Sequence, residues 1–238
     1  MAKERLDKLI ASTGRWSRRE VKTLVREGRV LVDGRIAGSA EEKYDAESCR
    51  IAVNGEELPL RRHTYVMLHK PAGVLSATKD GRGRTVLDLL TPELRKIGVF
   101  PVGRLDKDTE GLLLLTDDGE LAHALLSPKK HVDKVYFARV SGRLTPEDCA
   151  AFEAGMTLGD GLECLPAGLE ILTAGETSEC LVTLREGKFH QVKRMLAARG
   201  KPVEYLKRLS MGPLQLDDTL APGEFRLLTA AEEAQLQR

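Results

Sequence analysis

The stretch PVGRLDKDTEGLLLLT at residues 101–116 places a dense cluster of charges directly before an apolar run. The run at residues 112–115 predicts a buried strand, because a short apolar segment bounded by polar residues is typical of one. Glycines on both sides of the charges permit sharp changes of backbone direction. We therefore expect Asp106 on a loop held between strands, where a rigid scaffold presents its carboxylate at a sheet edge. An ordinary polar turn, with Asp106 or Asp108 bonded to its own backbone, is the alternative.

Around this stretch, the spacing of apolar residues predicts both strands and helices. Strands are expected at residues 65–68, 112–115, 135–140 and 181–184. Helices are expected at residues 120–126, where Ser127-Pro128 ends the helix, from Thr145, at residues 190–199 and after Thr229. Because strands and helices do not alternate regularly, we expect an α+β domain whose mixed, mostly antiparallel sheet is flanked by helices.

The N-terminal part of the chain predicts a smaller unit of two short helices followed by small strands. Residues 17–20, Ser-Arg-Arg-Glu, have the S-x-x-E pattern of a capping box, so the second helix begins at Ser17, and Gly28 ends it. Asp33-Gly34 and Asn54-Gly55 each follow a short β-prone run and predict tight hairpin turns.

A segment without periodicity separates the two parts. Residues 58–63, LPLRRH, contain a proline and follow the last predicted hairpin, which makes them the best candidate for a domain boundary. The expected domains are therefore residues 1–60 and residues 64–238, and the second is long enough to bury a core of its own.

The formal net charge of +1 conceals two basic regions. Residues 3–35 hold ten Lys or Arg against five Asp or Glu, and residues 185–208 hold eight against two. Local basic surfaces in an otherwise neutral protein suit a polyanionic partner. A solvated charged surface without a partner is the alternative for either region taken alone.

Several classes of protein are disfavoured by the composition. No window approaches the roughly 18 apolar residues of a membrane-spanning helix. The first ten residues, MAKERLDKLI, do not form the apolar core of a secretory signal. We therefore expect a cytoplasmic protein without a membrane partner. The four cysteines lie far apart without a CxxC pair, which predicts neither a metal site nor disulfides. We expect them to be small buried hydrophobes.

The N-terminal motifs resemble the S4 RNA-binding module over about residues 3–60. The similarity rests on R-L-D-K-x-I near the start, S-R-R-E at the second helix and G-R-V-x-V-D-G after it. The residues themselves predict an outward basic face on the second helix, suited to phosphate contacts that position an RNA without reading its sequence. The expected RNA-binding residues are Arg18, Arg19, Lys22 and Arg26.

The larger domain resembles the pseudouridine synthases of the RsuA and RluA groups, which isomerise uridine in RNA. The charged stretch is similar to their catalytic motif G-R-L-D-x-x-T-x-G-L-L-L-L-T, and three further motifs appear in the expected order along the chain. These are L-H-K-P-A-G at residues 68–73, K-V-Y at 134–136 and E-G-K-F-H-Q-V-K-R-M at 186–195. The RsuA branch has the same arrangement of an S4 module before the catalytic domain.

The resemblance implies roles for individual residues. Asp106 matches the family's essential aspartate and Tyr136 its active-site tyrosine. Lys193 matches the basic residue that pairs with the aspartate, although many relatives have arginine there, so a two-pronged contact is replaced by a point charge. Leu206 matches an apolar residue lining the pocket, and Arg104 an arginine implicated in displacing the target base.

Chemistry of this kind breaks the bond from ribose C1′ to base N1 and joins C1′ to C5, so it needs no redox partner and no cofactor is expected. An ionised carboxylate beside the sugar is required, and a cation opposite it favours that form. We further expect Lys70 to contact a phosphate. For Arg194, a phosphate contact and a solvated position are equally plausible. His190 is most simply a helix cap or a structural hydrogen-bond partner.

The leading hypothesis is a monomeric enzyme that modifies one uridine of 16S small-subunit rRNA, with rRNA or a ribosomal assembly intermediate as its partner. A 23S rRNA enzyme is the alternative within the family. From other classes, we consider a noncatalytic ribosome-assembly factor and a metal-dependent nuclease using Asp106 and Asp108. A binding factor gains nothing from a buried carboxylate–lysine pair. A nuclease is disfavoured because the loop lacks further carboxylates suited to two-metal chemistry and Lys193 would compete for the charge.

Overall fold

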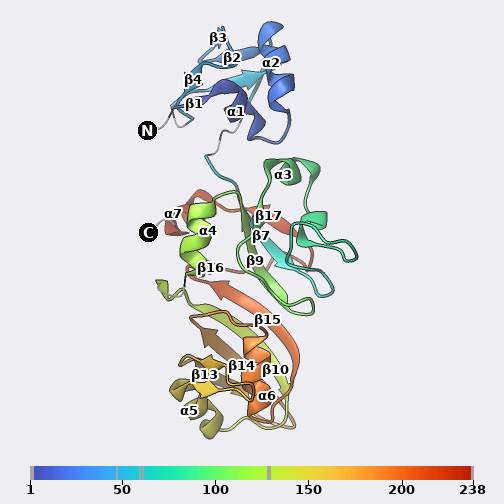
Figure 1. The fold of residues 1–238 in the computed structure, drawn as a ribbon, viewed down its shortest axis with the longest axis vertical. Helices are drawn as coiled ribbons and strands as arrows, with labels where there is room; N and C mark the ends of the chain where they lie inside the picture. Colours follow the sequence, from blue (N-terminus) through green and yellow to red (C-terminus); the bar gives the residue numbers. More distant parts are fainter. Residues whose placement is uncertain (1–2, 47, 59, 61, 128–129, 237–238) are drawn as a thin grey trace. The chain divides into compact units, whose positions relative to one another are not determined.

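A computed structural model describes residues 3–46, 48–58, 60, 62–127 and 130–236. The chain forms two compact units, one of residues 1–64 with 90–99 and one of residues 65–89 with 100–238 (Figure 1). Pro59 and Arg61 of the predicted boundary segment, and Pro128 of the predicted helix end, lie outside the described residues. No helix in the described ranges is long and apolar enough to cross a membrane.

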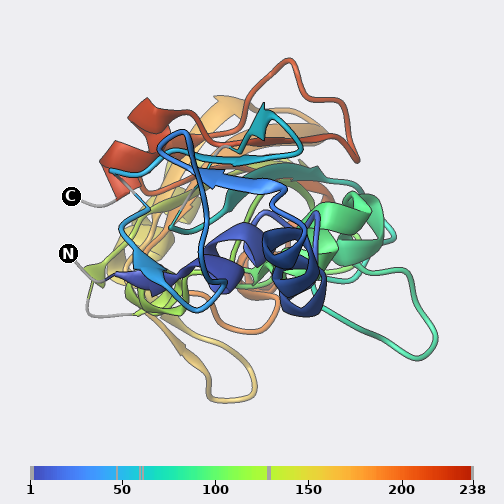
Figure 2. The same ribbon diagram turned by 90° about the horizontal axis from the view of Figure 1, so that it is seen from above.

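The first unit contains the two short helices and small strands expected of it. Its elements are β1 (Glu4–Arg5), α1 (Leu6–Ala11), α2 (Arg18–Arg26), β2 (Val30–Val32), β3 (Arg35–Ile36), β4 (Lys43–Tyr44), β5 (Ile51–Val53), β6 (Glu56–Glu57) and α3 (Pro92–Ile97). Helices α1 and α2 lie side by side (Figure 2). Strands β3, β2, β5 and β6 form one antiparallel sheet, and β1 pairs with β4.

Local chemistry explains where these elements begin and turn. Ser17 accepts a hydrogen bond from the backbone of Glu20, and the Glu20 carboxylate accepts one from the backbone of Ser17, so the predicted capping box is confirmed. Asp33 and Asn54 both have a positive φ, of 48° and 56°, and each is followed by a left-handed glycine. Such a pair of left-handed residues is what a tight hairpin needs.

The second unit is built on one mixed sheet. Its elements are β7 (Tyr65–Lys70), the short 3-10 helix Val86–Leu89, β8 (Phe100–Pro101), β9 (Glu110–Thr116), α4 (Gly119–Leu126), β10 (Lys134–Ser141), α5 (Pro146–Ala154), β11 (Met156–Thr157), β12 (Glu163–Cys164), β13 (Gly168–Thr173), β14 (Thr177–Leu184), α6 (Gln191–Ala198), β15 (Val203–Met211), β16 (Leu214–Gln215), β17 (Phe225–Leu227) and α7 (Ala230–Leu236).

The sheet has the order β13-β14-β10-β15-β9-β7-β17, with β8 paired to β9 and β16 to β15. Strands β9 and β15 are parallel, and the other neighbouring pairs are antiparallel. The prediction of an α+β domain with a mixed, mostly antiparallel sheet is confirmed. A core cluster joins Leu112 and Leu114 of β9 to Ala122 and Leu125 of α4.

An ion-pair network ties the C-terminal helix to the sheet. Arg226 on β17 donates from Nε to Asp217 at 2.6 Å and forms a two-pronged contact with Glu232 on α7 at 2.8 Å. The hydrogen bonds from Arg226 are the main reason that the pKa of Glu232 falls to about 2. Of the four cysteines, Cys164 and Cys180 are buried and Cys49 and Cys149 half-buried, and all are free thiols.

Candidate active site

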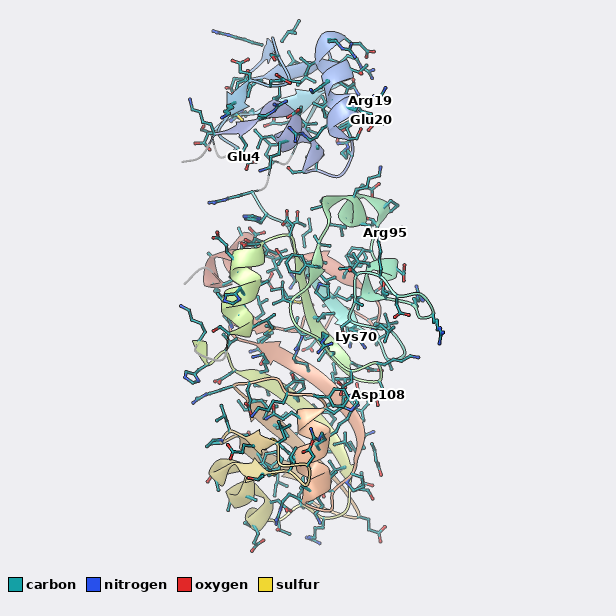
Figure 3. The ribbon with its side chains drawn as sticks, in the orientation of Figure 1. Glu4, Arg19, Glu20, Lys70, Arg95 and Asp108 are labelled. Carbon is teal, nitrogen blue, oxygen red and sulfur yellow. The ribbon has the colours of Figure 1, made fainter. Side chains whose placement is uncertain are left out.

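One buried lysine holds the loop that carries Asp106 through hydrogen bonds to its backbone. Lys70, the last residue of β7, is fully buried. Its Nζ atom donates to the backbone carbonyls of Asp106 at 3.0 Å, Lys107 at 3.2 Å, Thr109 at 2.8 Å and Pro71 at 3.1 Å. Three of these carbonyls belong to the loop, so a single ammonium group fixes its path. Figure 3 labels Lys70 and, on the loop, Asp108.

This position of Lys70 corrects the expected phosphate contact. An ammonium group that is buried and fully engaged with carbonyl oxygens is not available to RNA. Burial lowers the pKa of Lys70 to about 8, and the charges of Asp108 and Asp106 only partly offset that effect. Lys70 therefore positions the Asp106 loop and does not bind the substrate.

The other side of the loop is clamped by Ser76. The Ser76 hydroxyl donates to the carbonyl of Leu105 at 2.9 Å and accepts from the Leu105 amide at 3.0 Å. The amide of Gly73 also donates to the carbonyl of Lys107 at 2.7 Å. Backbone on both sides of Asp106 is thus hydrogen-bonded to neighbouring segments, as a preorganised catalytic loop requires.

Lys193 on α6 brings a positive charge to two carboxylates at once. Its Nζ atom lies 3.2 Å from Oδ2 of Asp106 and 2.5 Å from Oδ1 of Asp108. The side chains of Asp106 and Lys193 are only 26% and 21% exposed, whereas that of Asp108 is 75% exposed. The hydrogen bond from Lys193 lowers the pKa of Asp108. Sequence reasoning predicted the contact with Asp106 but missed the second carboxylate.

His190 occupies the residue before α6 and also faces Asp106. It has a left-handed backbone, with φ of 49° and ψ of 33°, and its Nε2 atom lies 3.5 Å from Oδ1 of Asp106. The ring of Phe189 stacks on the imidazole, with centroids 3.8 Å apart, and Phe189 is 72% exposed. The neighbouring Gln191 donates to the Glu186 carboxylate at 2.7 Å, which indicates a structural role for this residue.

A cavity of about 620 Å³ opens beside this cluster and brings three of the expected site residues together. Arg104, Asp106 and Tyr136 line it, together with Phe189 and His190. A smaller adjoining cavity of about 70 Å³ shares Arg104, Asp106 and Tyr136 and is also lined by Leu206. Tyr136 on β10 is largely buried and lines both cavities.

One glycine permits the close approach of the strands that carry the site. Gly111 at the start of β9 has φ of +102°, and a Cβ atom there would lie 2.2 Å from the carbonyl oxygen of Arg208 on β15. Any side chain would therefore push β9 away from β15 at their parallel contact. Close packing at Gly111 keeps the Asp106 loop beside Tyr136 and Leu206.

Two groups of predicted binding residues lie outside the cavity. Arg194 extends from α6 and pairs with Asp160. In the first unit, Arg18, Arg19, Lys22 and Arg26 are all exposed on α2, and Figure 3 marks Arg19 on this helix. Arg18 donates to the fully buried Asp7 at 2.9 Å, and Lys22 donates to Glu41 at 3.1 Å. Two of these cations thus have acidic partners within the unit.

Within the described residues, no group of three His, Cys, Asp or Glu side chains is arranged to hold a metal ion. The described residues instead bring a carboxylate and an aromatic ring to the wall of a nucleotide-sized cavity, and an ammonium group pairs with that carboxylate.

The comparison with family models decides the identity of the larger unit. A model described as RNA pseudouridylate synthase matches residues 64–198, more than half of the chain. The chain belongs to the RNA pseudouridylate synthase family. A second model, the S4 domain, matches residues 4–48, so the resemblance of the N-terminal part is confirmed as well. As a pseudouridylate synthase, the protein is an isomerase that acts on RNA.

Individual pseudouridylate synthases are similar over nearly the whole chain. An uncharacterized RNA pseudouridine synthase, YtzG of Bacillus subtilis, is 50% identical and covers 96% of both chains. Ribosomal small subunit pseudouridine synthase A of Vibrio cholerae is 40% identical, covering 98% of this chain and 99% of its own. A crystal structure of a pseudouridylate synthase with 35% identity superposes with a TM-score of 0.68, covering 98% of this chain and 99% of the other.

Proposed function

We propose that this pseudouridylate synthase converts one uridine of 16S small-subunit rRNA to pseudouridine. Relatives named as small-subunit enzymes, at 38–40% identity over nearly the full chain, support this substrate. Ribosomal large subunit pseudouridine synthase B of Bacillus subtilis is 39% identical over 98% of this chain, so 23S rRNA is the alternative substrate. The partner in either case is rRNA or a ribosomal assembly intermediate.

The observation that carries the catalytic part of this proposal is the contact of Lys193 with Asp106, a residue that lines the cavity. In the proposed reaction the Asp106 carboxylate acts on the ribose, either by attacking C1′ or by removing a ribose proton. Lys193 keeps positive charge beside that carboxylate. Its second contact, with Asp108, holds the ammonium group in place against the loop.

The remaining cavity residues act on the base and its surroundings. The ring of Tyr136 stacks on the detached uracil while the base rotates, and its phenol helps to remove the C5 proton. Leu206, which is buried, excludes water from the smaller cavity. The exposed side chain of Arg104 enters the helix of the RNA in place of the displaced uridine. Arg194 makes a phosphate contact outside the cavity when it releases Asp160.

RNA affinity beyond the cavity comes from the S4 domain in this proposal. We assign residues 1–60 to RNA binding and residues 64–238 to catalysis, with the exposed cations of α2 as the phosphate contacts. The enzyme acts as a cytoplasmic monomer, and the isomerisation requires no cofactor because bond making balances bond breaking within one nucleotide.

Mapping pseudouridine in rRNA from cells with and without this protein tests the proposal. Deletion is expected to remove pseudouridine at one position of 16S rRNA. The wild-type protein restores it, and the Asp106→Asn variant does not. Loss at a 23S position instead supports the alternative substrate, and an unchanged rRNA map contradicts both.

A further inference from the structure

Two buried basic residues beside the cavity have no role in the proposed reaction. Lys134 on β10 and Arg208 on β15 are 7% and 2% exposed. Arg208 lies directly opposite Tyr136 in the register of the two strands, and Lys134 lies two residues before Tyr136 on the same alternating buried face. Both residues line the 620 Å³ cavity together with Asp106.

Neither cation has an acidic partner among the described residues. The Nε atom of Arg208 donates to the carbonyl of Leu112 at 2.8 Å, and its Nη2 atom is buried without a hydrogen-bond partner in the part of the chain that the structure describes. Lys134 donates from Nζ to the carbonyl of Val132 at 2.9 Å. Buried polar atoms are normally satisfied, so an unused guanidinium nitrogen next to a cavity points to a ligand.

The electrostatics of the pair are unfavourable without an anion. Burial lowers the pKa of Lys134 and the positive charge of Arg208 lowers it further, and the charge of Asp133 offsets these effects only in part. Two like charges held in a poorly solvated place destabilise the folded protein unless an opposite charge offsets them. A functional site is where such an arrangement is expected.

We propose that Lys134 and Arg208 form a phosphate subsite for one of the two phosphodiesters that flank the target uridine. The inference rests on the proposed function, because it takes the anion to be RNA. A phosphodiester carries one negative charge on two non-bridging oxygens, and these accept hydrogen bonds from the free Nη2 of Arg208 and from the Lys134 ammonium. The subsite lies beside Tyr136 and Asp106. A nucleotide whose base stacks on Tyr136 and whose sugar lies at Asp106 has a flanking phosphate near this position.

The subsite positions the reacting sugar. A phosphate gripped at one cavity wall fixes the ribose attached to it, so C1′ stays at the Asp106 carboxylate while the base is detached and turned. Lys134 and Arg208 are therefore expected to affect the concentration at which RNA saturates the enzyme and, through the position of C1′, the maximal single-turnover rate.

A substituted RNA tests the subsite in the full-length protein. Once the target uridine is mapped, short RNAs are made with a single neutral methylphosphonate at the phosphate on its 5′ side, on its 3′ side, or one linkage further away. Release of tritium from C5 is measured under single-turnover conditions over a range of enzyme concentrations. The wild type is compared with Lys134→Met and with Lys188→Met, since Lys188 lines the same cavity but already pairs with Glu186 at 3.0 Å.

A methylphosphonate is expected to weaken RNA binding strongly at only one of the two flanking linkages. For the wild type, the methylphosphonate there raises the half-saturating enzyme concentration roughly 10- to 100-fold. Lys134→Met weakens binding of the unmodified RNA by a similar factor, and the methylphosphonate at this linkage weakens its binding no further. Lys188→Met still binds the methylphosphonate RNA more weakly than the unmodified RNA. This non-additivity between the variant and the methylphosphonate is a coupling, and the linkage that shows it, 5′ or 3′, carries the phosphate bound by the subsite.

The proposal is overturned if the variant and the methylphosphonate act independently. In that case the losses of RNA affinity from Lys134→Met and from the methylphosphonate multiply at every linkage, and no phosphate contacts Lys134. Lys134→Arg keeps the charge and is expected to restore the sensitivity, which separates a charge contact from a packing defect. Circular dichroism establishes that each variant is folded. Failure of the wild type to convert any unmodified rRNA segment contradicts the proposed function, whereas normal conversion without coupling contradicts the subsite alone.

Discussion

The Nζ atom of Lys193 lies 3.2 Å from Oδ2 of Asp106, and both side chains are largely shielded from solvent. Lys193 belongs to helix α6, whereas Asp106 belongs to the loop before β9, so the contact exists only when both of these segments are in their folded positions. An ion pair in such a place is less screened than one on an open surface, and loss of either partner has a larger effect.

Replacement of Asp106 by Asn is expected to abolish isomerisation while preserving the fold. The amide has nearly the size of the carboxylate but lacks the ionised oxygen needed at the ribose. Tritium release from C5-labelled RNA is expected to fall to background, while RNA affinity measured by filter binding stays within about threefold of the wild type, since the phosphate contacts remain. Turnover at the wild-type rate contradicts the assignment of Asp106.

Lys193→Met is expected to lower the single-turnover rate at saturating enzyme by roughly 100-fold or more, because the Asp106 and Asp108 carboxylates both lose the ammonium group that they share. Lys193→Arg retains the charge and is expected to keep substantial activity. Asp108→Asn is the matched control, since it leaves the Asp106 contact intact and is expected to cost less than Lys193→Met. If Lys193 serves only as a phosphate contact, the methionine variant loses affinity and keeps its maximal rate.

Lys70→Met is expected to reduce the maximal rate by about 100-fold with little change in RNA affinity, because the Asp106 loop loses the ammonium that fixes three of its carbonyls. A stability measurement checks the same contact. The folded pKa of about 8 lies below the ordinary value of 10.5, so the unfolded chain binds the extra proton between these values. Wild-type stability relative to the variant should therefore increase as the pH rises through this window. Urea unfolding at a series of pH values measures it, and a constant difference contradicts the buried, pKa-lowered lysine.

On the S4 domain, substitution of Arg18 is expected to differ in its effects from substitution of Arg19 or Arg26 on the same helix. Arg19→Gln and Arg26→Gln are expected to weaken RNA binding uniformly and to reduce the slope of log affinity against log salt by about 1 for each lost phosphate contact. Arg18→Gln is expected in addition to destabilise the unit by about 1–2 kcal/mol, because the buried Asp7 loses a charged donor. Filter binding across a salt series and thermal unfolding distinguish these effects. Equal salt slopes for wild type and all variants remove α2 from the RNA interface.

Acid is expected to release the C-terminal helix through Glu232. The pKa of this carboxyl is lowered from 4.5 to about 2, chiefly by hydrogen bonds from Arg226, so its stabilising contribution is complete above pH 4.5 and is lost as the pH falls toward 2. Glu232→Gln should therefore destabilise the protein by about 1–3 kcal/mol near neutral pH, and the difference from wild type should vanish in acid. Urea unfolding from about pH 7 to pH 2.5 measures the trend. A difference that does not change with pH shows that Glu232 is not ionised against Arg226.

Local signals in the sequence predicted many of the elements. The capping box at Ser17 and the Asp33-Gly34 and Asn54-Gly55 turns depend on neighbouring residues only, and the structure confirms them. Strand β15 was not predicted, because its buried face consists of Leu206, Arg208 and Ser210, and a buried arginine breaks the apolar alternation by which strands are identified. Edge strand β13 has the same difficulty, since its exposed and buried positions differ little in composition.

In the candidate site, motifs singled out residues that share a cavity, but they did not predict all of the contacts of these residues. Asp106, Tyr136, Leu206 and Arg104 gather at the cavity as expected. The function of Lys70 depends on backbone carbonyls thirty-six or more positions away, and side-chain patterns contain no information on those. The free nitrogen of Arg208 likewise becomes visible only when the neighbours of the side chain are known.

The acceptors around Lys70 are main-chain oxygens, which every amino acid possesses. The contact of Lys70 with Lys107 therefore does not depend on the side chain at position 107, and that position remains open to variation. Mutation there can adjust the charge around the reacting carboxylate in small steps while this backbone contact is inherited unchanged. Evolution or a protein engineer can thus alter the chemistry of this loop without rebuilding its architecture.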